Sequence, residues 1–191
     1  MSISFDDFSH LEVLILSGAV DAIRQQEFFS VLRVQPNLAR DYDEDGTSLL
    51  MVAADAGNRA AIEALCNMGA NVNAKSDCGE TALENAVRRE WKDESEGEIR
   101  YEMVQLLLEH GAYPNLIGSN GCNALHWAVI EGDPATVELL LRYKADVDLC
   151  TDDRNPMTAM DIVQSGRSWG TVARREVIAG LLAKAERRKY G

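Results

Sequence analysis

The chain has 191 residues and a mass of 21.0 kDa, which fits one domain or two small ones. Hydrophobic residues make up 46% of it and charged residues 26%, a composition that excludes a disordered or a collagen-like chain. The 19 basic and 31 acidic side chains give a formal charge of −12, which disfavours nucleic acid and anionic lipid as partners and favours basic proteins, although the same charge could serve solubility alone.

No uncharged stretch is long enough to cross a bilayer. The first residues, MSISFDDFSH, carry two aspartates and no basic residue, so they do not resemble a secretory signal and we expect a cytoplasmic protein. The cysteines form no CxxC pair, and with three histidines they make no zinc pattern, so we expect free thiols, no metal and no cofactor. These cysteines are Cys66, Cys78, Cys122 and Cys150.

A pair of helices is predicted before Asp43. Leu11–Leu16 can form the first helix, which Gly18 ends, and the second carries an apolar cluster at Phe28, Phe29, Val31 and Leu32. This pair looks like a degenerate copy of the units that follow.

Four segments of the chain align with one another, starting at Asp43, Ser76, Gly118 and Asp153. Leu50 and Leu83 lie 33 residues apart, and Leu83 and Leu125 lie 42 apart, which is the same period plus nine residues. The extra residues fall within Arg88–Arg100, between the two helices of the second unit. The closing turns, at Gly69, Gly111 and Lys144, repeat with the same two intervals.

Each unit has the same predicted parts. A turn opens it at a glycine, a first helix carries small residues that permit close packing, and a second helix carries apolar residues at helical spacing. One unit cannot bury its apolar face alone, so neighbouring units must stack. The small residues are Ala53, Ala54, Ala86 and Ala128, and the apolar groups include Ile62 with Leu65, Val104 with Leu107, and Val137 with Leu140.

The last unit is expected to cap the array. It keeps Thr158, Ala159 and Met160 but has Pro156 where the other units have their opening glycine. Its final helix ends in KAERRKY, and we expect the run Arg187–Lys189 to be a solvated helix end.

The first helices begin with SLLMVA, TALENA, NALHWA and TAMDIV, which resemble the T-P-L-H-x-A signature of the ankyrin repeat family. The resemblance implies an all-α solenoid of stacked helix pairs with hairpin-like turns, about five pairs with irregular caps. It also implies a structural role for His126, hydrogen-bonded within the turn region. We expect one domain over 1–191, divided into 1–42, 43–75, 76–117, 118–152 and 153–191.

The resemblance also implies where a partner would bind, because stacking aligns the turn tips and the outward side of the first helices into one concave face. The tip at Asp41–Asp45 places four carboxylates around Tyr42, a preferred interface anchor, although aspartate is also common in solvated turns. The candidate partner-binding residues are Tyr42, Asp43, Glu44, Asp45, Asp55, Asp77, Glu80, Arg88, Arg89, Trp91, Ile130, Glu131 and Arg154.

Two inserts carry a tryptophan each. Trp91 lies in the charged stretch EWKDESEGEIR and Trp169 in the insert at 165–173, and either indole could bind a partner or pack back onto its helix pair.

The segment Gly166–Gly170 matches GxSxG, the pattern around the nucleophile of a serine hydrolase, with Ser168 as the nucleophile. That pattern needs a strand before the serine and a histidine after it, whereas here a predicted helix precedes it and all three histidines lie upstream. A serine hydrolase therefore remains only as the alternative.

The favoured function is a non-catalytic module, a monomer when alone, that binds one protein with a basic surface and neither nucleic acid nor membrane. Its role would be that of an inhibitor or an adaptor. The sharper hypothesis is an immunity protein that neutralises a basic toxin or nuclease, since an acidic protein imitates the charge of a nuclease's substrate.

Overall fold

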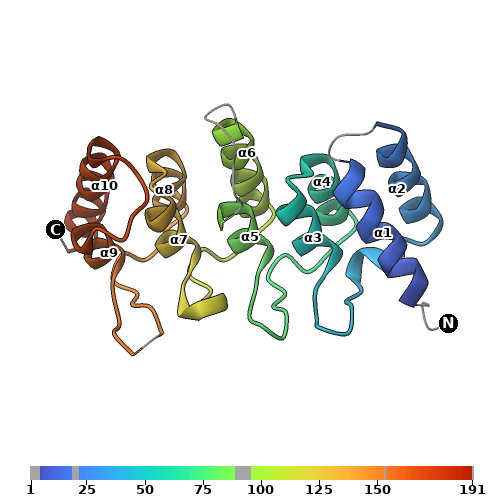
Figure 1. Cartoon of the computed structure of the whole chain (residues 1–191), viewed down its shortest axis with the longest axis horizontal. Coiled ribbons are helices and arrows are strands. Elements are labelled where there is room, and N and C mark those ends of the chain that lie inside the picture. Colours follow the sequence, from blue (N-terminus) through green and yellow to red (C-terminus); the bar gives the residue numbers. More distant parts are fainter. Residues whose placement is uncertain (1–4, 19–21, 89–95, 153, 191) are drawn as a thin grey trace. The chain divides into compact units, whose positions relative to one another are not determined.

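A computed structural model describes residues 5–18, 22–88, 96–152 and 154–190 (Figure 1). These residues form ten α-helices and two short 3₁₀ helices, and the strand-like pairing among them is one isolated bridge between Tyr42 and Ser48. The prediction of an all-α fold with five helix pairs is confirmed. The chain divides into two compact units, Met1–Ala112 (unit 1) and Tyr113–Gly191 (unit 2). The prediction of a single domain stays a prediction.

Unit 1 contains three helix pairs. α3 contacts both α1 and α5 in an inner row, and α4 packs against α6 in an outer row (Figure 1). The predicted degenerate first repeat is a complete helix pair. The helices are α1 (Phe5–Gly18), α2 (Ala22–Val34), α3 (Leu49–Ala56), α4 (Arg59–Asn67), α5 (Ala82–Arg88) and α6 (Glu96–Glu109), with the 3₁₀ helix η1 (Pro36–Arg40) after α2.

Unit 2 contains two helix pairs built on the same plan. The inner helices α7 and α9 pack against each other, as do the outer helices α8 and α10 (Figure 1). The helices are α7 (Ala124–Glu131), α8 (Pro134–Arg142), α9 (Ala159–Ser165) and α10 (Val172–Tyr190), with the 3₁₀ helix η2 (Ser119–Gly121) before α7.

The inner helices of the four aligned repeats begin at a capping residue, which is why the signature recurs. In each, a side-chain oxygen of the first signature residue accepts a hydrogen bond from the backbone N–H three residues later. A cap of this kind stabilises a helix by about 1 kcal/mol. The capping residues are Ser48, Thr81, Asn123 and Thr158.

Backbone contacts link successive turns within each unit. The Asp77 N–H donates to the Asp45 carbonyl at 2.9 Å in unit 1, and the Asp152 N–H donates to the Gly121 carbonyl at 2.8 Å in unit 2. Since a backbone bond fixes the distance between two turns, side chains on neighbouring tips are held in register within a unit.

The insert of the second repeat is partly helical. The period places the start of α6 at Tyr101, by analogy with Arg59 in α4, yet α6 begins five residues earlier, at Glu96. The predicted site residues Arg89 and Trp91 lie outside the described residues.

At the end of α10, Arg187 and Arg188 are exposed, as expected for a solvated helix end, whereas Lys189 is held by ion pairs. Lys189 forms ion pairs with Asp146 and with Asp148, the latter at 2.9 Å, in the loop that follows α8. The hydrogen bond that Lys189 donates to Asp146, together with one from the Asp148 N–H, lowers the pKa of Asp146 from its ordinary value of 3.8. The pairs attach the C-terminal turn of α10 to the loop after α8.

His126 has the structural role that the family resemblance implied. Its Nδ1 accepts a hydrogen bond from the Asn123 N–H, so its Nε2 carries the proton and donates to the Leu149 carbonyl at 2.9 Å. The side chain is 1% exposed, and this burial lowers the pKa of His126, against the opposing effect of the Leu149 carbonyl. A second proton on Nδ1 would break the cap of α7.

The stability of unit 2 is expected to depend on the protonation of His126. Its folded pKa lies below its ordinary value of 6.5, so its contribution is complete above pH 6.5 and is lost as the pH falls toward the lowered pKa. His126→Gln can still accept from the Asn123 N–H but does not titrate. We expect this variant to be about 1–2 kcal/mol less stable at neutral pH and to lose part of the pH dependence. Denaturant unfolding across this pH range measures both, and equal pH slopes for the two proteins would contradict the assignment.

A close backbone contact holds the loop between α9 and α10. A Cβ atom on Gly132 would lie 2.4 Å from the Cα of Gly170, and Gly132 has a φ of +68°. Gly166 has a φ of +74°, but the nearest atom to its Cβ position lies at 3.5 Å. An alanine at either position would have to adopt a left-handed backbone conformation, which strains it. Only the Cβ atom of Gly132→Ala would in addition displace the loop.

Gly132→Ala should therefore destabilise the protein more than Gly166→Ala. We expect both to lose about 1 kcal/mol to backbone strain and Gly132→Ala to lose about 1–3 kcal/mol more to overpacking. Denaturant unfolding compares them, and trypsin cleavage after Arg167 reports whether the loop has left its site. Similar losses of stability in the two variants would show that the loop can move away from Gly132 at little cost, and would contradict the prediction.

Candidate functional site

The inner helices and opening turns of unit 1 line a groove of about 810 Å³. Its walls come from α1, α3 and α5, so the groove exists because three inner helices stand side by side. Three of its residues, Asp55, Glu80 and Arg88, were predicted as binding positions. The lining consists of Glu12, Leu16, Thr47, Met51, Val52, Asp55, Glu80, Asn85 and Arg88.

The groove carries the carboxylate of Glu12, which is repelled by that of Asp43 outside the lining. Burial raises the pKa of Glu12, and the negative charge of Asp43 raises it further. Asp55 is exposed on α3. The cation of the groove, Arg88, lies 3.6 Å from Glu80 and 3.8 Å from Glu84, so carboxylates of this chain already share its charge. A ligand in the groove therefore meets a negative potential.

Apolar side chains supply the rest of the lining. Leu16 is 54% exposed on α1, Met51 is buried, and Val52 is half-buried on α3. Met51 takes the place of the signature histidine in the first aligned repeat. The groove thus combines an aliphatic floor with acidic walls, a combination suited to a segment that is both basic and partly apolar.

The turn tips of unit 1 bring together five predicted site residues. Tyr42 is 45% exposed, and Glu44, Asp45 and Asp77 are exposed. Asp43 has a structural task, because its Oδ1 accepts hydrogen bonds from the N–H groups of Asp45 and of Thr47. Within the acidic run at Asp41–Asp45, Asp43 therefore folds the turn and Asp41 is half-buried, whereas Glu44 and Asp45 face solvent.

The other predicted residues that the structure describes lie in unit 2. Ile130 and Glu131 end α7, and Arg154 is exposed in the turn before α9. The loop between α9 and α10 packs through its backbone, since the Trp169 N–H donates to the Ile130 carbonyl at 2.7 Å. The indole of Trp169 is nevertheless 74% exposed.

The serine hydrolase alternative has little support in this fold. Ser168 follows the helix α9 where a strand would be needed, and its buried Oγ has no hydrogen-bond partner among the described residues. A serine nucleophile needs an adjacent base. Among all the residues that the structure describes, no three His, Cys, Asp or Glu side chains form a group that could hold a metal ion.

None of the helices that the structure describes has both the length and the apolar character needed to span a membrane.

Comparison with family models matches the sequence of this chain to one family. The family model described as "Ankyrin repeats (3 copies)" matches residues 11–117 and 95–169. The chain therefore belongs to the ankyrin repeat family. Ankyrin repeats generally mediate protein–protein interactions, and the family is typically non-catalytic.

Relatives with the same repeats occur in viruses, bacteria and animals. The chain is 32% identical to the ankyrin repeat protein FPV031 of fowlpox virus over 150 residues, which is 76% of this chain and 40% of that protein. It is 36% identical to an ankyrin repeat-containing protein of Treponema pallidum over 98 residues, 51% of this chain and 30% of that protein. It is 34% identical over 121 residues to human BCL-6 corepressor-like protein 1, 63% of this chain and 6% of that protein. The chain thus spans less than half the length of these relatives.

The repulsion between Glu12 and Asp43 can be tested directly. Asp43→Asn removes the charge that raises the pKa of Glu12 but keeps an oxygen that can accept the turn's hydrogen bonds, so we expect the pKa of Glu12 to fall. An NMR titration of the side-chain carboxyl carbons measures it. Asp77→Asn is the control and should leave the pKa of Glu12 unchanged. If Glu12 titrates alike in the wild type and in Asp43→Asn, the two carboxylates do not repel each other.

Proposed function

We propose that the groove on the inner helices of unit 1 binds a basic, partly apolar segment of one protein partner. The observation that carries this proposal is the composition of the groove, in which Glu12 and Asp55 stand beside Leu16, Met51 and Val52. A lysine or arginine of the partner would meet the carboxylates, and an aliphatic side chain would cover the apolar floor.

The charge of the chain supports a basic partner. Residues 1–112 carry 21 acidic and 9 basic side chains, whereas residues 113–191 carry ten of each, so the net charge of the protein belongs to unit 1. A field of this sign accelerates the approach of a basic protein and slows that of nucleic acid or an anionic membrane.

The raised pKa of Glu12 supports the same proposal. A cation beside Glu12 would oppose both the burial and the repulsion from Asp43 that raise its pKa, so binding would lower the pKa of Glu12. Binding should then weaken as the pH falls through the raised pKa, because the protonated carboxyl no longer attracts the partner.

The role proposed for this binding is to cover the basic surface of the partner, as an inhibitor or adaptor does. A toxin or nuclease whose basic surface binds an anionic substrate would be neutralised in this way, which keeps the immunity protein as the sharper version. The activity of a captured partner, measured with and without this chain, separates the roles. An inhibitor abolishes that activity, whereas an adaptor leaves it intact.

A synthetic peptide in which leucine follows pairs of lysines tests the binding. We expect saturable binding to the whole chain, and we expect Asp55→Lys to weaken it on the order of tenfold and to reduce its salt dependence. Glu98→Lys makes the same charge change at an exposed position on the outer helix α6 and serves as the control. Fluorescence anisotropy at low and physiological salt measures the affinities. Equal losses in the two variants, or no saturable binding at either salt concentration, would overturn the proposal.

A further inference from the structure

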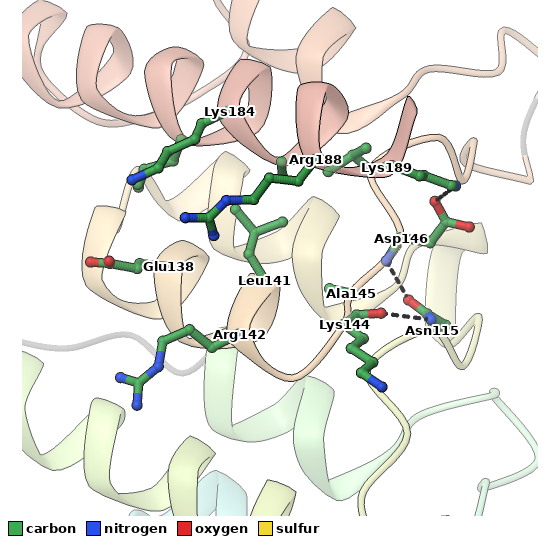
Figure 2. A pocket seen from close by; sticks show the side chains of 13 residues that line it. Asn115, Glu138, Leu141, Arg142, Lys144, Ala145, Asp146, Lys184, Arg188 and Lys189 are labelled. Carbon is green, nitrogen blue, oxygen red and sulfur yellow. Dashed lines mark hydrogen bonds and ion pairs between the residues drawn. The ribbon is translucent and has the colours of Figure 1, made fainter. Parts of the chain in front are cut away.

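A second groove of opposite character lies in unit 2, between the outer helices α8 and α10 (Figure 2). Its volume is about 430 Å³, within the range of pockets that hold small ligands or a few side chains. The floor is aliphatic and half-buried or buried, and consists of Leu141, Ala145, Leu181 and Ala185.

Cationic side chains surround this floor. Five basic residues and two acidic ones line the groove, in a protein whose overall charge is −12. Lys184 and Arg188 extend from α10 and Arg142 from α8, and Figure 2 shows their charged ends on the same side of the groove as Glu138. All three cations are exposed.

These three cations are not used by the fold that the structure describes. Among the described residues, the side chains of Arg142, Lys184 and Arg188 form no ion pair and no hydrogen bond, whereas Lys189 beside them is paired with Asp146 and Asp148. The two acidic lining residues do not neutralise the excess positive charge of the groove, because Asp146 is already ion-paired with Lys189.

The outer helices of unit 1 show what a purely structural arrangement looks like. There Arg59 on α4 lies 3.4 Å from Glu63 on its own helix and 3.4 Å from Glu102 on α6. The cation between those outer helices is thus neutralised by this chain, whereas the cations between α8 and α10 are left for another molecule.

We propose that the groove between α8 and α10 binds an acidic peptide segment of a protein partner that also carries an aliphatic side chain. The guanidinium groups of Arg142 and Arg188 can each bind a carboxylate in a bidentate manner, and Lys184 adds a third positive charge. The aliphatic side chain would cover Leu141 and Ala185 on the floor. This site is independent of the basic partner of unit 1, so the chain presents two docking grooves that select segments of opposite charge.

The test uses the whole chain and a synthetic peptide in which leucine follows pairs of glutamates. We expect saturable binding, and we expect Arg142→Glu and Arg188→Glu each to weaken it on the order of tenfold or more. Arg187→Glu is the matched control, because Arg187 is exposed on the same turn of α10 but does not line the groove. Arg188→Lys keeps the charge without the bidentate geometry and should lose less than Arg188→Glu. Circular dichroism confirms that the variants fold.

Three kinds of outcome would overturn the proposal. The first is the absence of saturable binding, or an equal loss in Arg187→Glu, which would show non-specific attraction. The second is equal affinity for a polyglutamate peptide without leucine, or for inorganic phosphate, which would make the groove a simple anion site. The third is salt-reversible self-association of the chain in sedimentation velocity that Arg188→Glu abolishes, which would place a second copy of this chain in the groove.

Discussion

The close packing of the inner helices is the contact on which the rest of unit 1 depends. Ala53 and Ala54 on α3 and Ala86 on α5 are completely buried, and their small side chains let the helix backbones approach. A larger side chain at these positions would separate the helices and break the backbone bond from Asp77 to Asp45. The groove takes its lining from α1, α3 and α5, so its width is set by the same alanines.

The helix pairs could be predicted because several independent sequence features repeat together. The capping residue, the buried alanines and the aliphatic second helix recur at one period, and each favours the same local structure. Even the closing turn with Lys144 in place of glycine keeps the left-handed backbone, at a φ of 65°. The insert was placed correctly, but its contribution to α6 was not foreseen, because nothing in its charged sequence distinguishes a helical extension from a loop.

The candidate sites were less predictable because they depend on which polar groups the fold itself uses. Asp43 looks like a surface charge in sequence, yet its carboxylate holds the turn. Lys189 looks like a solvated tail residue, yet it is ion-paired with Asp146 and Asp148. Glu12 was not predicted as a site residue, because the degenerate first repeat has no signature that would place Glu12 beside α3. The position at which a histidine is typical could have drawn attention to Met51, which lines the groove.

The groove in unit 2 could not be predicted from the sequence for a related reason. Arg142 and Arg188 are 46 residues apart and belong to different repeats, and the basic tail of the last repeat has no counterpart in the others. Only the packing of α10 on α8 brings them together. The two units therefore share one architecture but differ in charge, as is usual when function lies in the residues displayed on a common fold.

The most direct test of whether the acidic inner groove is a binding site is hydrogen–deuterium exchange. The whole chain exchanges with and without the lysine–leucine peptide, and mass spectrometry measures the exchange of each segment. The account predicts slower exchange in the turns at 42–48 and 76–80 and along α3, with α8 and α10 unchanged. Protection confined to α8 and α10, or no protection anywhere at saturating peptide, would contradict it.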